Sequence, residues 1–83
     1  MSEQSGDMRA LVEQLAKSLV DEPDHVSVSQ VDGSEATVLE LKVAPGDVGK
    51  VIGRQGRTAR AIRTVLGAVG MKYHKHYTLE IVE

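Results

Sequence analysis

The start of the chain follows a helical pattern of apolar and polar positions. Over residues 8–20 the apolar side chains recur at intervals of three and four residues, which places them on one face of a helix. Asp7 stands at the position of an N-cap, and Pro23 ends the pattern shortly after Asp21. The sequence therefore predicts a helix over residues 8–21, preceded by a flexible tail at residues 1–7.

Two stretches of alternating polarity follow, at residues 25–31 and 36–43. Both are rich in β-branched residues, and the second places four side chains on one face: Thr37, Leu39, Leu41 and Val43. The Asp-Gly pair in the intervening "DGSE" is typical of a tight hairpin connection. These stretches predict two antiparallel strands.

Helical spacing returns after the turn "APGD", whose Asp47 is placed to cap the next element. Val48, Val51 and Ile52 fall on one side of a short helix that ends at Gly53. A second helix begins after Gly56 and is predicted to end at Gly70. Its inward face is predicted to hold Thr58, Ile62, Val65, Leu66 and Val69, and its opposite face Arg57, Arg60 and Arg63.

The chain closes with "YTLEIV", an alternating strand with Tyr77, Leu79 and Ile81 inward. The order of elements is α-β-β-α-α-β, without repeats. A helical crossover normally makes the strands that it joins parallel, so a mixed three-stranded sheet is expected. The predicted fold class is a two-layer α+β domain with the helices on one sheet face.

Charge is distributed unevenly behind a net value of −2. Residues 1–47 contain three Lys or Arg against ten Asp or Glu, a net charge of −7. Residues 48–83 contain seven Lys or Arg against two Glu, a net charge of +5, and residues 48–79 contain no acidic residue. This asymmetry predicts a basic face and an anionic partner for the C-terminal half.

Composition narrows the class of protein further. With 83 residues and no Cys, Phe or Trp, the chain has an aliphatic core, no disulfide and a thin stability margin that association with another chain would improve. The N-terminus is neither a signal peptide nor an anchor, and no apolar run is long enough to span a bilayer. We expect a soluble cytoplasmic domain without contact to a membrane.

The segment "KVIGRQGRTAR" holds the candidate chemistry. A turn between two helices exposes the first backbone N–H groups of the second helix, which with the helix dipole attract an anion. Glycines at both ends, Gly53 and Gly56, permit positive φ and let a sugar-phosphate backbone approach closely. Lys50, Arg54 and Arg57 surround this position with positive charge, and Val51 and Ile52 could wall a slot for bases.

The motif "VIGRQG", set between two short helices in an α-β-β-α-α-β chain, resembles the KH family in its type II arrangement. The resemblance covers residues 8–83, the predicted KH domain, and extends to small stand-alone bacterial KH proteins of the KhpA/YlqC kind. It implies a protein that clamps roughly four nucleotides of single-stranded RNA by their backbone. The clamp would be Gly53, Arg54, Gln55 and Gly56, with Ile52 at the floor of the groove.

The resemblance also implies an opposite wall, for which the loop before the last strand, "MKYHKH", supplies Lys72, Lys75 and His76. Arg57, Arg60 and Arg63 form either a solvated helix face or an RNA-facing one, and the lack of acidic partners favours RNA slightly. No aromatic residue lies near the clamp, so modest affinity and slight sequence preference are expected. Tyr73 and Tyr77 are expected to pack against the core rather than stack on bases.

The sequence gives weaker evidence for nucleotide hydrolysis, catalysis or metal binding. Residues 51–58 lack the first Gly and the Lys of a phosphate-binding NTPase loop, and no catalytic triad or paired carboxylate occurs, so no enzyme is predicted. His74 and His76, with the distant His25, are more often polar strand-entrance residues than metal ligands, so no metal and no cofactor is expected.

Two functional hypotheses remain. The first is a broad single-stranded RNA binder that acts as a post-transcriptional regulator or RNA chaperone. The second is a dimerisation or protein-interaction scaffold whose RNA contact is secondary. The resemblance implies a homodimer, or a heterodimer with a larger Jag-like KH protein, and Val51 and Ile52 are candidate contact residues.

Overall fold

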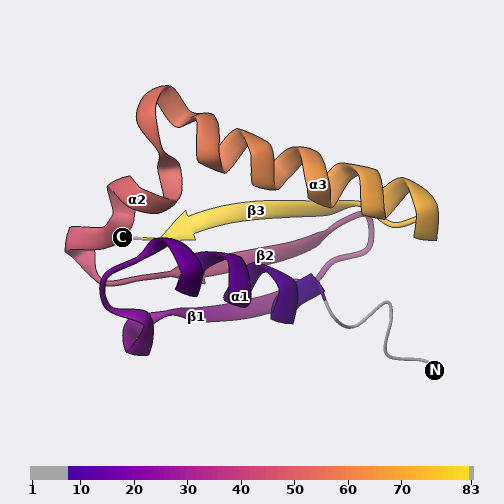
Figure 1. Ribbon diagram of the computed structural model, residues 1–83. Helices are drawn as coiled ribbons and strands as arrows, with labels where there is room; N and C mark the ends of the chain where they lie inside the picture. Colours follow the sequence, from indigo (N-terminus) through magenta and orange to yellow (C-terminus); the bar gives the residue numbers. More distant parts are fainter. Residues whose placement is uncertain (1–7, 83) are drawn as a thin grey trace.

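In the computed structural model, which describes residues 8–82, three strands form one mixed sheet and three α-helices lie over one of its faces (Figure 1). The predicted tail and the Asp7 N-cap lie outside the described residues. The elements in chain order are α1 (Met8–Leu19), η2 (Pro23–His25), β1 (Ser27–Asp32), β2 (Thr37–Lys42), η3 (Pro45–Asp47), α2 (Val48–Ile52), η4 (Arg54–Gly56), α3 (Arg57–Tyr73) and β3 (Tyr77–Val82).

The sheet has the strand order β1-β2-β3. β1 and β2 form an antiparallel hairpin that sets Val28 opposite Leu41, and β2 and β3 run parallel with Leu39 beside Leu79. The predicted α+β class, element order and parallel crossover are confirmed.

The core lies between the sheet and the helices. Leu39 and Leu41 of the central strand are fully buried. Val12 of α1 and Leu66 of α3 are buried to the same degree, with at most 1% of their surface exposed. Tyr77 is also buried, as predicted. Burial of this aliphatic layer is the main force that holds the helices on the sheet.

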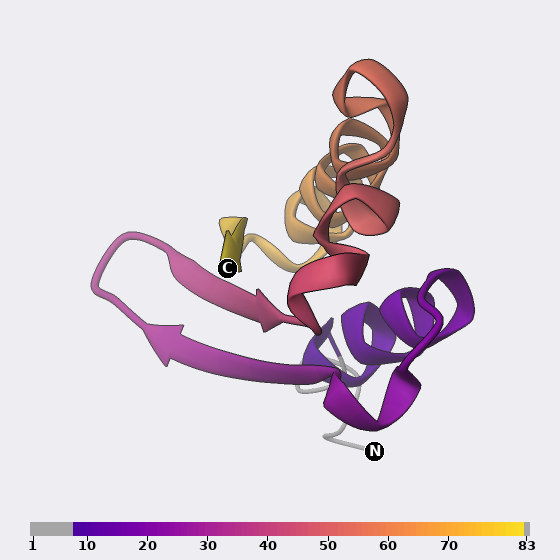
Figure 2. The same ribbon diagram turned by 90° about the vertical axis from the view of Figure 1, so that its left-hand side faces the viewer.

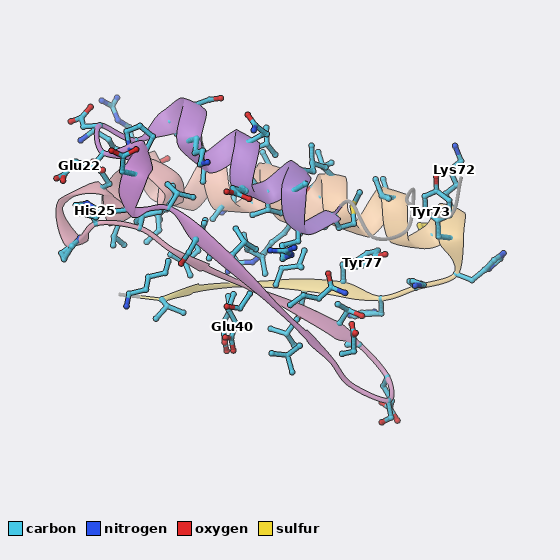
Figure 3. The ribbon with its side chains drawn as sticks, turned by 90° about the horizontal axis from the view of Figure 1, so that it is seen from below. Glu22, His25, Glu40, Lys72, Tyr73 and Tyr77 are labelled. Carbon is cyan, nitrogen blue, oxygen red and sulfur yellow. The ribbon has the colours of Figure 1, made fainter. Side chains whose placement is uncertain are left out.

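The opposite sheet face is open. Glu40 points away from the helices (Figure 3), and the parallel register places it directly beside Glu80. Val31 and Val82 are exposed on the same face. The sheet is therefore covered on one side only.

The first helix is two residues shorter than predicted. The Val20 N–H still donates to the Ala16 carbonyl at 3.2 Å, but the Glu22 N–H donates to Asp47 Oδ2 at 3.0 Å, outside the helix. Pro23 disfavours helical backbone at the residue before it and starts η2 instead. The chain therefore leaves α1 at Leu19.

The inward face of α3 was predicted only in part. Ile62 and Leu66 are buried, and Val69 packs partly against the core. Val65, however, is 44% exposed, and Ala59 takes an inward position instead. The helical period alone could not show whether the side of α3 that carries Val65 or the side that carries Ala59 faces the sheet.

The prediction that Gly70 ends the second helix is wrong. α3 continues to Tyr73, and His74 ends it in the left-handed conformation with φ 58°. Gly70 is buried inside the helix because the chain returns across it: the Lys75 N–H donates to the Gly70 carbonyl at 2.8 Å, and a Cβ on Gly70 would overlap the Lys75 carbonyl oxygen. The glycine permits close packing rather than helix termination.

This packing predicts opposite effects for two glycines of the same helix. Gly70→Ala should lower the free energy of unfolding by about 1–3 kcal/mol, because the new methyl group overlaps backbone. Gly67→Ala, with nothing within 4 Å of the new Cβ, should raise it by about 0.5–1 kcal/mol through helix propensity. Urea denaturation measures both, and equal effects of the two substitutions would contradict this account of Gly70.

Candidate nucleic-acid interface

The turn between α2 and α3 is built on two glycines with positive φ. Gly53 has φ 81° and ψ 168°, a region that is almost exclusive to glycine, and Gly56 is left-handed with φ 74°. The Gly53 N–H donates to Gly49 at 2.8 Å and the Gly56 N–H to Gly53 at 3.0 Å. The turn therefore carries the chain from α2 into α3 within four residues.

The two glycines differ in what surrounds them. A Cβ on Gly53 would overlap Thr58 Oγ1 and lie 2.7 Å from Thr58 Cβ, whereas a Cβ on Gly56 would meet nothing within 4 Å. Gly53 is thus required by both conformation and close approach of α3. Gly56 is favoured by its conformation alone.

Arg54 and Gln55, between the glycines, are exposed. Gln55 also has positive φ, 58°, which no feature of the sequence indicated. Non-glycine residues in this conformation are uncommon and are often found at functional sites. The tight turn leaves both side chains in solvent.

The turn projects away from the sheet at the N-terminal end of α3 (Figures 1 and 2). The first N–H groups of an α-helix lack partners one turn earlier, so this end carries partial positive charge. Arg57 and Arg60 are exposed on the first turn of α3. Arg63 is exposed too, but its Nη2 donates to the Leu79 carbonyl of β3 at 3.4 Å. Arg54, Arg57 and Arg60 are therefore the arginines near the turn without a described acidic or carbonyl partner.

Lys50 lies close to the turn in sequence but has acidic neighbours. Its Nζ is 3.4 Å from Asp21 Oδ2 and 3.7 Å from Asp47 Oδ1. The three-residue spacing of Asp47 and Lys50 was a signal for this pair, whereas Asp21 is brought in by the fold. Asp47 makes no side-chain capping bond to α2, contrary to the prediction.

Lys72 and Lys75 lie at the other end of α3. Fifteen residues separate Arg57 from Lys72, a helix rise of about 22 Å. Lys72 Nζ is 5.7 Å from the centroid of the half-buried Tyr73 ring (Figure 3). The structure thus forms two basic groups at the two ends of α3, instead of one groove with facing walls beside the turn.

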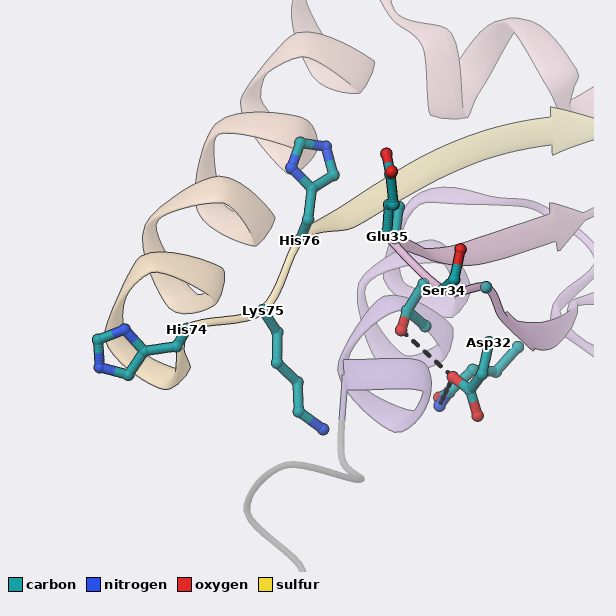
Figure 4. A pocket seen from close by; sticks show the side chains of 10 residues that line it. Asp32, Ser34, Glu35, His74, Lys75 and His76 are labelled. Atoms are coloured by element: carbon teal, nitrogen blue, oxygen red, sulfur yellow. Dashed lines mark hydrogen bonds between the residues drawn. The ribbon is translucent and has the colours of Figure 1, made fainter.

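Lys75 and His76 line a hollow of about 470 Å³ between their loop and the β1–β2 hairpin (Figure 4). His74 lines it as well, and the hairpin contributes Asp32 and Glu35. Asp32 Oδ1 accepts hydrogen bonds from Gln30 at 3.0 Å and Thr37 at 3.2 Å. The hollow therefore has charges of both signs.

The apolar residues before the turn divide between core and surface. Val51 is fully buried in the core and Ile52 is half-buried. Val51 therefore cannot wall a slot for bases or form a dimer contact, contrary to the prediction. Ile52 is the residue of this pair that remains accessible beside Gly53.

Within residues 8–82, no group of three or more His, Cys, Asp or Glu side chains is arranged to hold a metal ion. No helix of that part of the chain is both long enough and apolar enough to cross a bilayer.

Comparison with known proteins identifies the family of the chain. A family model described as "KhpA/KhpB, KH domain" matches residues 9–81. The chain belongs to the KhpA/KhpB family of KH domains. No solved structure matches this KhpA/KhpB-family chain.

Several curated relatives within the family are named "RNA-binding protein KhpA". The protein of Clostridium acetobutylicum is 57% identical over 75 residues, covering 90% of this chain and 100% of the relative. That of Aquifex aeolicus is 50% identical over 76 residues, covering 92% and 96%. That of Chlamydia trachomatis is 42% identical over 76 residues, covering 92% and 97%. The resemblance to small stand-alone KH proteins is confirmed.

The unequal surroundings of the two turn glycines predict unequal tolerance to substitution. Gly53→Ala should lower the free energy of unfolding by at least about 2 kcal/mol, from backbone strain and overlap with Thr58. Gly56→Asn should change it by no more than about 0.5 kcal/mol, because Asn tolerates the left-handed region and the space is open. Thermal unfolding of both variants checks this, and a larger loss for Gly56→Asn would contradict it.

Proposed function

We propose that this protein binds single-stranded RNA by clamping the sugar-phosphate backbone at the turn Gly53–Gly56. One observation carries the proposal: a four-residue turn with positive φ at Gly53, Gln55 and Gly56 exposes the side chains of Arg54 and Gln55 directly before the N-terminus of α3. Membership of a KH family whose relatives are named RNA-binding proteins supports the same partner.

The proposed contacts fall into two groups. Arg54, Arg57 and Arg60 meet phosphates near the turn, where Gly53 and Gly56 let the backbone approach and Ile52 offers an apolar surface for a base. Lys72 and Lys75 provide a second basic group that an RNA following α3 could reach. Lys50 is left out of the contact set because its ammonium group already faces two carboxylates.

Broad specificity follows from the kinds of contact available. Phosphate contacts carry no base information, and in the described chain the two tyrosines lie at the opposite end of α3 from the turn. A backbone clamp of this kind suits a non-enzymatic post-transcriptional regulator or RNA chaperone in the cytoplasm. It would act on many transcripts.

Assembly with a second KH protein, either another copy or a larger Jag-like protein, is proposed as a companion property. Val65 and Met71 of α3 are 44% and 81% exposed, so apolar surface is available outside the proposed clamp. Sedimentation of the protein at high micromolar concentration tests the homodimer. A pure scaffold with incidental RNA contact is the alternative function.

The clamp predicts that Arg54→Asp/Gln55→Asp weakens binding to a short single-stranded RNA by more than about tenfold. The change places two carboxylates beside the phosphate and removes a charge-assisted hydrogen bond. Asp tolerates the left-handed conformation of Gln55, so the melting temperature should change little. Fluorescence anisotropy with a labelled RNA measures the affinity.

The matched control is Arg9→Asp/Gln14→Asp on exposed positions of α1, which makes the same change in net charge. It should weaken binding far less. Full affinity in a folded clamp variant would favour the scaffold alternative.

Backbone clamping also predicts the salt dependence of binding. Three neutralised phosphates give a slope of log K against log salt of about −2, or roughly 20-fold weaker binding at 200 mM than at 50 mM salt. Arg57→Ala should flatten the slope by about 0.7 and weaken all RNA sequences alike, whereas Arg9→Ala should do neither. A salt-independent affinity, or a loss confined to one sequence, would rule out this mechanism.

A further inference from the structure

Asp47 stands out among residues 8–82 as the one charged residue that is buried, with 3% of its surface exposed. Its Oδ2 accepts the Glu22 N–H at 3.0 Å, which joins the segment after α1 to the start of α2. A buried carboxylate is costly unless hydrogen bonds and a cation compensate it. The Asp47 side chain therefore needs a positive partner.

Lys50 is the described cation within ion-pair distance of Asp47, at 3.7 Å. The same ammonium group is 3.4 Å from Asp21, whose side chain is 77% exposed. Lys50 thus bridges α2 to the segment after α1 at the same place as the Asp47 hydrogen bond. We call these three side chains, Asp21, Asp47 and Lys50, the Asp47 cluster.

The Asp47 cluster lies at the start of α2, the short helix that leads into the proposed clamp. α2 has only five residues, from Val48 to Ile52, and the Gly53 N–H is bonded to Gly49 inside it. Because the helix is so short, a shift at its first turn passes directly to Gly53. Compensation of the buried Asp47 carboxylate therefore affects the position of α2 and, through it, the position of the turn Gly53–Gly56.

We infer that Lys50 is a positioning residue for RNA binding: it compensates buried Asp47, fixes α2 against the segment after α1, and so holds the turn Gly53–Gly56 in place. This inference rests on the proposed function. It replaces the expectation from the sequence that Lys50 contacts RNA directly. A phosphate contact and a positioning role differ in salt dependence, since only the former releases counterions from the RNA.

Lys50→Gln leaves Asp47 buried without its cation. The melting temperature should fall by about 4–8 °C, the shift expected when the free energy of unfolding of a domain of this length decreases moderately. Affinity for single-stranded RNA should fall by about fivefold, with the slope of log K against log salt unchanged. Loss of a phosphate contact would instead flatten the slope by about 0.7.

The decisive variant is Asp47→Asn/Lys50→Gln. It removes both charges while the Asn oxygen can still accept the Glu22 N–H, and neutral replacement of both partners costs little. Both melting temperature and RNA affinity should return to near the wild-type values, although the positive charge of Lys50 is still missing. Lys17→Gln, which removes an exposed cation of α1 paired with Glu13, is the matched control and should change neither.

The outcomes separate the two proposals. A double variant that folds but keeps the weak affinity and a flattened slope would show that Lys50 touches phosphate, and would overturn the inference. An unchanged melting temperature in Lys50→Gln would overturn it as well. If Lys50→Gln fails to fold, the double variant alone decides. If the wild-type protein binds no RNA, the proposed function fails, while the melting temperatures still test the Asp47 cluster.

Discussion

The parallel pairing of β2 with β3 is the constraint on which the rest of the structure depends. Two parallel neighbours cannot be joined by a short turn, so the chain must return the full length of the sheet between them. α3 makes that return over the helical face, and its burial against the sheet fixes its direction. The junction of α2 and α3 therefore lies at the end of the molecule where β2 finishes (Figure 1), and this junction is the positive-φ turn.

Electrostatics in this small domain is divided between folding and recognition. The acidic half of the sequence supplies Asp21 and Asp47, whose carboxylates pair with the ammonium group of Lys50. The arginines of α3 lie on a stretch without acidic residues, so their charge is available to solvent, except where Arg63 reaches β3. Lys50 and the arginines of α3 are close in sequence, but within residues 8–82 they have different partners because the fold places carboxylates beside Lys50 only.

The fold could be predicted from the sequence because each element had a clear period and the crossover rule fixed the strand direction. The glycine turn was predictable as well, since Gly53 and Gly56 flank a break between two helical patterns. The errors came from tertiary contacts. Gly70 resembles a helix end until Lys75 is seen packing on it, and Asp47 resembles a cap until Glu22 is seen donating to it.

Placement of the basic residues was beyond what the sequence could settle. The family resemblance implies that Lys72 and Lys75 form a wall opposite the turn, but the length of α3 separates them from it. The left-handed conformation of Gln55 and the contact of Gly53 with Thr58 had no pattern in the sequence, because both depend on how α2 and α3 meet.

The uncovered sheet face has a consequence for how copies of the protein meet. Glu40 of the central strand and Glu80 of the edge strand β3 lie side by side on this face, where like charges repel. Stacking two such faces would bring four carboxylates together, and their desolvation and repulsion would oppose the gain from burying the exposed valines. Glu40 and Glu80 therefore disfavour the stacking of two copies of the protein through this sheet face.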